Sequence, residues 1–160
     1  MSDETPVTYE KIEASLRELG LQYLKGNDGT FLAIFGSNAQ RSEMQVYLSI
    51  DGSMHDIFVM RGTSPERFPA SDASLLLRLV NQWNSEFRWP KCTMSYTPDG
   101  SALSVWADFQ IKTQSGISAD LLAETIATFI GCTDQSCIWL REQLELPSAD
   151  DLEEWMKRAS

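Results

Sequence analysis

The chain has 160 residues, a length typical of a single domain, and its 42% hydrophobic and 22% charged residues are those of an ordinary globular protein. Thirteen basic against 23 acidic residues give a net charge of −10, which disfavours binding to nucleic-acid phosphates and to anionic membranes. A single histidine, His55, excludes most multi-histidine metal sites. Because no stretch approaches the ~20 apolar residues of a membrane span, we expect no membrane association.

The three cysteines, Cys92, Cys132 and Cys137, do not form the dense pattern of a disulfide framework. Cys132 and Cys137 are five residues apart, which on a helix places them ~140° apart around the axis and argues against a shared metal ion. The polar, acidic N-terminus lacks the pattern of a signal peptide. We therefore expect a cytoplasmic protein with reduced thiols and with no metal or other cofactor.

The first part of the chain predicts one helix followed by about four strands. Thr8 is a suitable cap for the helix and Gly20 a suitable stop, and Ile12 and Leu16 lie at helical spacing between them. Turn sequences such as GNDG then separate short runs of apolar and alternating residues. The strands are expected over residues 21–25, 31–35, 44–50 and 57–60.

The middle of the chain predicts a loop over residues 63–70 and then a helix that Ser71 caps and that ends before Pro90. Trp83 falls on the apolar face of this helix. Two strands joined by the turn Pro98-Asp99-Gly100 follow, and we expect them over residues 91–97 and 103–111.

The last part of the chain predicts a long helix capped by Ser118, with a bend or break over residues 131–136. A short helix restarts at Pro147, and its apolar stripe includes Trp155 and Met156.

This order of elements is helix, four strands, helix, two strands, helix, with a short terminal helix appended. Clustered strands with short connections favour an α+β fold, in which helices pack on an antiparallel sheet, over alternating βαβ units. We expect one domain over residues 1–160, with its core at about 7–141 and an acidic helical extension over 142–160.

No catalytic motif accompanies these elements. A thiol nucleophile needs a histidine base, and His55 follows a turn, where an exposed side chain is the simpler interpretation. The acidic pairs Asp150-Asp151 and Glu153-Glu154 fit a solvated helix face. The absence of paired acid–base groups argues against an enzyme. The alternative is an enzyme or a small-ligand module with a pocket that no sequence motif indicates.

Several aromatic residues are candidates for a contact surface. Trp106 lies on the polar face of its strand, so it is either covered by a second layer or part of an interface. Trp155 with Met156 either contacts a partner or packs within the monomer. Aromatic side chains read single strands only beside a basic groove, and the most basic segment, residues 57–98, carries five bases and three acids, a charge of +2. These features favour a protein partner over a nucleic acid.

The most distinctive stretch is NQWNSEFRWPK, residues 81–91. Asn81 and Asn84 are suited to hydrogen bonding the backbone at the helix end, Trp83 is suited to the core, and Trp89-Pro90 fixes the turn into the next strand. The competing interpretation is a recognition surface, whose members are Trp89, Lys91 and Trp106.

With Gly116, Ile117 and Ser118 at the start of the long helix, this stretch resembles the YbjN family of bacterial sensory transduction regulators. The resemblance covers residues 7–140 and leaves the tail over residues 142–160 unmatched. It implies a fold similar to type III secretion chaperones, which are α+β dimers that hold partner polypeptides on an apolar surface. It therefore implies a non-enzymatic, homodimeric, partner-binding regulator in a stress or sensory pathway, without catalytic residues.

Overall fold

The structure is a computed structural model that describes residues 5–37, 43–144 and 149–159, with the side chains of 149–152 excepted. Its helices are α1 (Tyr9–Glu18), α2 (Ala73–Glu86), α3 (Ala119–Leu144) and α4 (Ala149–Ala159), and a 3₁₀ turn, Ala70–Asp72, precedes α2. Its strands are β1 (Tyr23–Lys25), β2 (Phe31–Phe35), β3 (Met44–Asp51), β4 (Ile57–Thr63), β5 (Phe68–Pro69), β6 (Lys91–Tyr96) and β7 (Ala102–Lys112).

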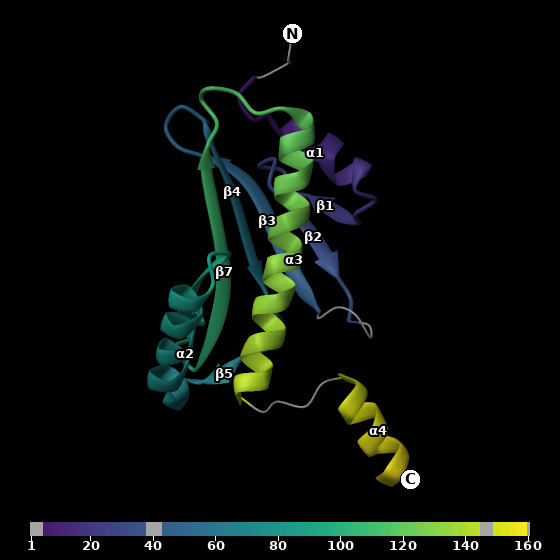
Figure 1. Ribbon diagram of the computed structural model, residues 1–160, viewed down its shortest axis with the longest axis vertical. Coiled ribbons are helices and arrows are strands. Elements are labelled where there is room, and N and C mark those ends of the chain that lie inside the picture. Colours follow the sequence, from purple (N-terminus) through teal and green to yellow (C-terminus); the bar gives the residue numbers. More distant parts are fainter. Residues whose placement is uncertain (1–4, 38–42, 145–148, 160) are drawn as a thin grey trace.

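The described strands form one antiparallel sheet, which confirms the predicted α+β class. Strands β1, β2, β3, β4 and β7 follow one another across it, and β7 pairs also with β5 and β6. Figure 1 shows α3 running along the sheet, with α1 beside its upper half and α2 beside its lower half. Alternation along the strands sends every second side chain to the helices, and these side chains form the core.

All three helices that pack on the sheet cover the same face. Val46, Gly62, Ala107 and Cys92 are register partners on neighbouring strands and therefore point to one side. Val46 and Ala107 belong to the core that includes side chains of α1 and α3, whereas Cys92 packs with Val80 and Trp83 of α2. In the described residues, no helix packs on the opposite face, which we call the open face.

The caps of α1 and α3 and the turn after α1 confirm the local predictions. Thr8 Oγ1 accepts a hydrogen bond from the Lys11 amide at 3.2 Å, and Ser118 Oγ accepts one from the Leu121 amide at 3.2 Å. Gly20 has a φ of +67°, a left-handed conformation that favours glycine after a helix end. These contacts depend only on neighbouring residues, so the sequence pattern was sufficient to predict them.

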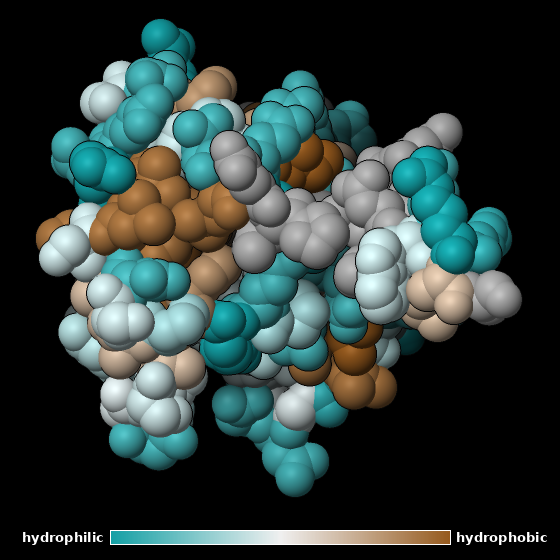
Figure 2. Space-filling view, turned by 90° about the horizontal axis from the view of Figure 1, so that it is seen from below, coloured by the Kyte–Doolittle hydropathy of each residue, from teal (hydrophilic) through white to brown (hydrophobic). Residues whose placement is uncertain are grey.

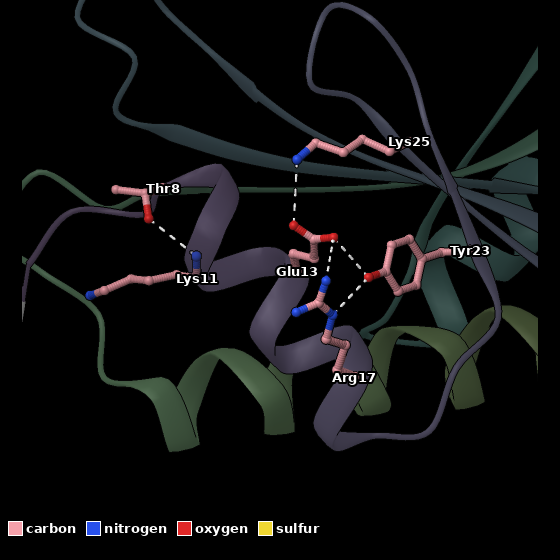
Figure 3. A network of polar contacts seen from close by, with 6 residues as sticks. All are labelled: Thr8, Lys11, Glu13, Arg17, Tyr23 and Lys25. Carbon is pink, nitrogen blue, oxygen red and sulfur yellow. Dashed lines mark hydrogen bonds and ion pairs between the residues drawn. The ribbon is translucent and has the colours of Figure 1, made fainter.

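A polar network fixes α1 to β1, as Figure 3 shows. The Glu13 carboxylate accepts hydrogen bonds from the Tyr23 hydroxyl at 2.9 Å and from Arg17 at 3.1 Å, and it pairs with Lys25 at 3.4 Å. The Tyr23 hydrogen bond, followed by the charge of Lys25, holds the pKa of Glu13 below its usual value. The first helix is thus attached to the edge of the sheet by charged as well as apolar contacts.

Two predictions about the middle of the chain are wrong. Residues 68–69 form β5 and pair with Leu103 and Ala102, so the expected loop contains a fifth strand before α2. Ser71 is exposed within the 3₁₀ turn and does not cap α2, which begins two residues later after Asp72 without a side-chain cap. Both features depend on pairing with the distant β7 and on backbone geometry that composition does not specify.

The expected break over residues 131–136 is also wrong, because α3 is one helix of 26 residues. Gly131 is exposed, whereas Phe129, Thr133, Ser136 and Leu140 are buried along one side of the helix. Packing of this side against the sheet outweighs the helix cost of one glycine, roughly 1 kcal/mol. None of the described helices is long and apolar enough to cross a membrane.

Candidate functional site

The motif residues Trp83 and Asn84 join α2 to β6. The Trp83 side chain is 4% exposed, and its Nε1 donates to the Pro90 carbonyl at 2.9 Å. Asn84 accepts from the Cys92 amide at 2.8 Å and donates to the Cys92 carbonyl at 2.9 Å. Asn84 therefore bonds the backbone of the following strand, so the predicted bond to the backbone at the helix end is wrong. Asn81 is exposed and makes no such bond among the described residues.

Trp83 is also the most deeply buried member of an aromatic cluster between α2 and α3. The Phe87 ring stacks on it at 4.1 Å between centroids, and the Trp139 ring of α3 meets it edge-on at 5.5 Å. Phe87 is 39% exposed, so the cluster reaches the surface. A shallow depression of ≈ 310 Å³, which we call the aromatic groove, is lined by Trp83, Phe87, Gln135, Ile138, Trp139 and Glu142.

Trp89 and Lys91 do not join Trp106 in one recognition surface. Trp89 is 40% exposed and packs at 4.9 Å on Phe109, whose ring faces Phe129 of α3, so Trp89 lies on the helix side of the sheet. Lys91 is exposed, and its amine donates to the Asn84 carbonyl at 3.2 Å. The three-residue surface that the sequence suggested is therefore not formed as a unit.

Trp106 is half-buried on the open face, within a group that we call the open-face patch: Tyr47, Arg61, Trp106 and Asp108. The Arg61 guanidinium lies 4.6 Å from the centre of the Trp106 ring, and the Tyr47 ring lies 5.9 Å away. Arg61 also bonds the Asp108 carboxylate at 2.7 Å, which fixes the guanidinium over the indole. The sequence predicted Trp106 but missed its neighbours, because they meet only through the pairing of β3, β4 and β7.

A small cavity lies beneath the aromatic groove, between α3 and the sheet. Its volume is ≈ 20 Å³, roughly the space of one water molecule, and Cys92, Thr133 and Cys137 are among its lining residues. Burial is the main cause that raises the pKa of both Cys92 and Cys137 to about 12. Both side chains are therefore neutral thiols at physiological pH, and neither has the properties of an activated nucleophile.

Further apolar side chains are exposed where β5, the start of α2 and the end of α3 meet. Leu77 is 59% exposed, and Leu75 and Leu144 are half-buried around the cluster that contains Phe68 and Leu76. Figure 2 shows brown apolar atoms gathered on the left of the lower end, the side on which Figure 1 places α2. Teal and white atoms surround this apolar patch (Figure 2).

The terminal helix α4 stands away from the sheet and its helices (Figure 1). Trp155 and Met156 are 67% and 65% exposed, so neither packs into the core. Lys157 pairs with Glu153 at 2.9 Å, and Arg158 pairs with Glu154 at 2.6 Å. Asp150 and Asp151 complete a strongly acidic first half of this helix.

The described part of the chain contains no group of three or more His, Cys, Asp or Glu side chains that could hold a metal ion. His55 is exposed in a turn with a φ of +51°, as the sequence suggested. The described cysteines are free of disulfides.

The model of the YbjN family, described as "putative bacterial sensory transduction regulator", matches residues 8–142. The chain belongs to the YbjN family. No curated protein matches it. Among solved structures, it is similar to the crystal structure of YbjN from E. coli, "a putative transcription regulator". That likeness has a TM-score of 0.67 at 10% identity and covers 91% of this chain and all of the other, so it establishes a common fold.

The family match separates the candidate residues into two groups. The aromatic groove, the open-face patch and the motif from Asn81 to Lys91 all lie inside the matched region. Helix α4, with Trp155 and Met156, lies outside it. The family model is described as that of a regulator.

Proposed function

We propose that this YbjN-family chain is a non-enzymatic cytoplasmic regulator that acts by binding a protein partner through its open face. The observation that carries this proposal is the open-face patch. No described helix covers Trp106, which is ringed by Tyr47 and by the ion pair of Arg61 with Asp108. An aromatic anchor within polar residues is the usual composition of a protein interface.

The experiment is capture of partners from the native cytoplasm by the tagged chain and by two variants. Trp106→Ala removes the proposed anchor. Tyr96→Ala removes an aromatic side chain that is 57% exposed on β6, outside the patch, and serves as the matched control. The proposal expects a partner, identified by mass spectrometry, that the original chain and the control retain and that Trp106→Ala loses. Equal retention by all three chains would contradict it.

We also propose that the chain is a homodimer that does not bind nucleic acids. The similar E. coli protein is described as "a putative transcription regulator", but a net charge of −10 opposes direct contact with phosphates. The test combines a measurement of solution mass with titration of labelled single- and double-stranded DNA at ~0.15 M salt. A monomer with micromolar or tighter affinity for DNA would overturn both parts of this proposal.

The alternative, a small-ligand module or an enzyme, has little support. It requires a pocket with converging polar groups. The cavity between α3 and the sheet has only ≈ 20 Å³, and its two neighbouring cysteines are neutral thiols. The aromatic groove is larger, at ≈ 310 Å³, but it lies at the surface, and Gln135 and Glu142 are the polar residues of its lining. We therefore prefer the regulatory function.

A further inference from the structure

The aromatic groove has the pattern of a surface that packs against another helix. Its residues on α3 are Gln135, Ile138, Trp139 and Glu142, spaced i, i+3, i+4 and i+7. This spacing places them in one stripe about 10 Å long on the outer side of the helix. The centre of the stripe is apolar, its ends are polar, and Phe87 of α2 forms the opposite wall.

The groove leaves apolar surface exposed at its centre. Phe87 is 39% exposed and Ile138 is 38% exposed, although Trp83 beneath them is almost completely buried. Two large side chains of an incoming helix, one turn apart, would fit on Ile138 and Trp139 between the walls. This is the arrangement by which amphipathic helices lie in apolar grooves, with anchors at i, i+3 or i+4 and i+7.

The charges around the groove favour a basic occupant. Glu142 lies at one end of the stripe and has no ion pair among the described residues. Helix α2 ends beside the groove at Glu86 and has no basic residue in its last turn. Near this helix end, the Lys91 amine bonds the Asn84 carbonyl and Arg88 follows Phe87. The whole chain adds a net charge of −10.

We propose that the aromatic groove binds a basic amphipathic helix of another polypeptide. Large apolar side chains of that helix contact Phe87, Ile138 and Trp139, and a lysine or arginine beside them pairs with Glu142. Helix α4 is a poor occupant, because its first half is acidic and its Lys157 and Arg158 already pair with Glu153 and Glu154. This site is separate from the open-face patch, and it depends on the proposed function only in that the partner is a polypeptide.

The test measures fluorescence anisotropy of a labelled, helical 14-residue peptide of leucine and lysine, and of the same peptide with glutamate in place of lysine. Ile138→Lys places a charge in the groove. Leu121→Lys makes the same change at another exposed apolar position of α3, outside the groove. Glu142→Lys reverses the charge at the groove end, and Glu124→Lys does so elsewhere on α3. Circular dichroism and thermal unfolding confirm that each variant folds.

We expect the lysine peptide to bind and the glutamate peptide not to bind. Each groove variant should weaken binding by about tenfold, and each control should change it by less than about threefold. Trp106→Ala should leave the affinity unchanged, so this test can succeed even if partner capture through the open face fails.

Absence of binding by the lysine peptide would overturn the proposal, and so would three further results. One is equal weakening by groove and control variants, which would indicate non-specific attraction to an acidic surface. Another is a dimer that Ile138→Lys converts to a monomer, which would make the groove an interface between copies of this chain. The third is a marked gain in peptide affinity when residues 149–160 are removed, which would identify α4 as the occupant.

Discussion

The Trp83 side chain connects three parts of the fold, since it packs on Phe87 and Trp139 and donates to the Pro90 carbonyl. We expect Trp83→Ala to cost ~3–5 kcal/mol of unfolding free energy, because truncation of a buried aromatic loses burial and leaves a cavity. Denaturant unfolding measures the change, and Trp155→Ala, which removes an exposed indole, is the control. Unchanged stability together with lost partner binding would show that Trp83 is a recognition residue.

The two asparagines of the motif should differ sharply in their contribution to stability. Asn84→Ala leaves the amide and carbonyl of Cys92 without their side-chain partner, and we expect a cost of ~1–3 kcal/mol. Asn81→Ala alters an exposed side chain of the same helix and should cost less than ~0.5 kcal/mol. Thermal unfolding of the two variants decides the matter, and equal costs would refute the role that we assign to Asn84.

The buried thiol of Cys92 should make the folded protein less stable at alkaline pH. Burial raises its pKa from 9.0 to about 12, so between these values the unfolded chain loses a proton that the folded chain keeps. Stability that is fully present below pH 9 should therefore fall as the pH rises toward 12, by about 1.4 kcal/mol per pH unit for this thiol. Denaturant unfolding at pH 8 and 10, with Cys92→Ala as the comparison, measures it. An equal decline in both chains would contradict the prediction.

At the scale of elements, the contact of α3 with β4 depends on the small size of Gly62. A Cβ at this position would lie 2.8 Å from Thr133 Cγ2, so Gly62→Ala should force the helix and the strand apart and cost ~1–3 kcal/mol. Gly131→Ala is the matched control, because nothing lies near its Cβ position and α3 is continuous there. It should stabilise the helix by up to ~1 kcal/mol. Thermal unfolding of both variants tests the pair, and a neutral Gly62→Ala would disprove the close contact.

The sequence predicts correctly those features of the elements that depend on neighbouring residues. It misses those that depend on contacts with residues far along the chain. Thr8, Gly20 and Ser118 act on residues next to them, and the structure confirms their roles. Strand β5 exists only because it pairs with β7, more than thirty residues later, and alternation in a two-residue segment carries no signal.

In the candidate site, too, the sequence reveals what depends on neighbouring residues and misses what depends on distant contacts. Trp106 was recognisable from its place on a polar strand face, but its contact with Arg61 requires the register of β4 with β7. Most groove residues on α3 lie after the expected break over residues 131–136, but the contact of Trp139 with Trp83 and Phe87 joins two helices and could not be predicted from either one alone. The sequence also could not assign Trp89 to the helix side and Trp106 to the open face, since sheet order decides this.

At the scale of the whole molecule, the fold should need neither metal nor disulfide. The described residues contain no metal-ligand cluster, and their three cysteines are free. The apolar core instead provides the stability expected for a chain of this length. A chelator and a reducing agent should therefore shift the melting temperature by less than about 2 °C in calorimetry. Stoichiometric zinc in the purified protein, or a large shift with either reagent, would contradict this.

The row of register partners on the helix face has a consequence for how this chain can vary. Gly62, Ala107 and Cys92 are neighbours across β4, β7 and β6, and together they make a trough of small side chains beneath Thr133 and Ser136 of α3. A larger side chain at any one of them would lift the helix away from the other two. These positions, far apart in the sequence, are therefore expected to change together, with a gain of volume on one strand matched by a loss on its neighbour or on α3.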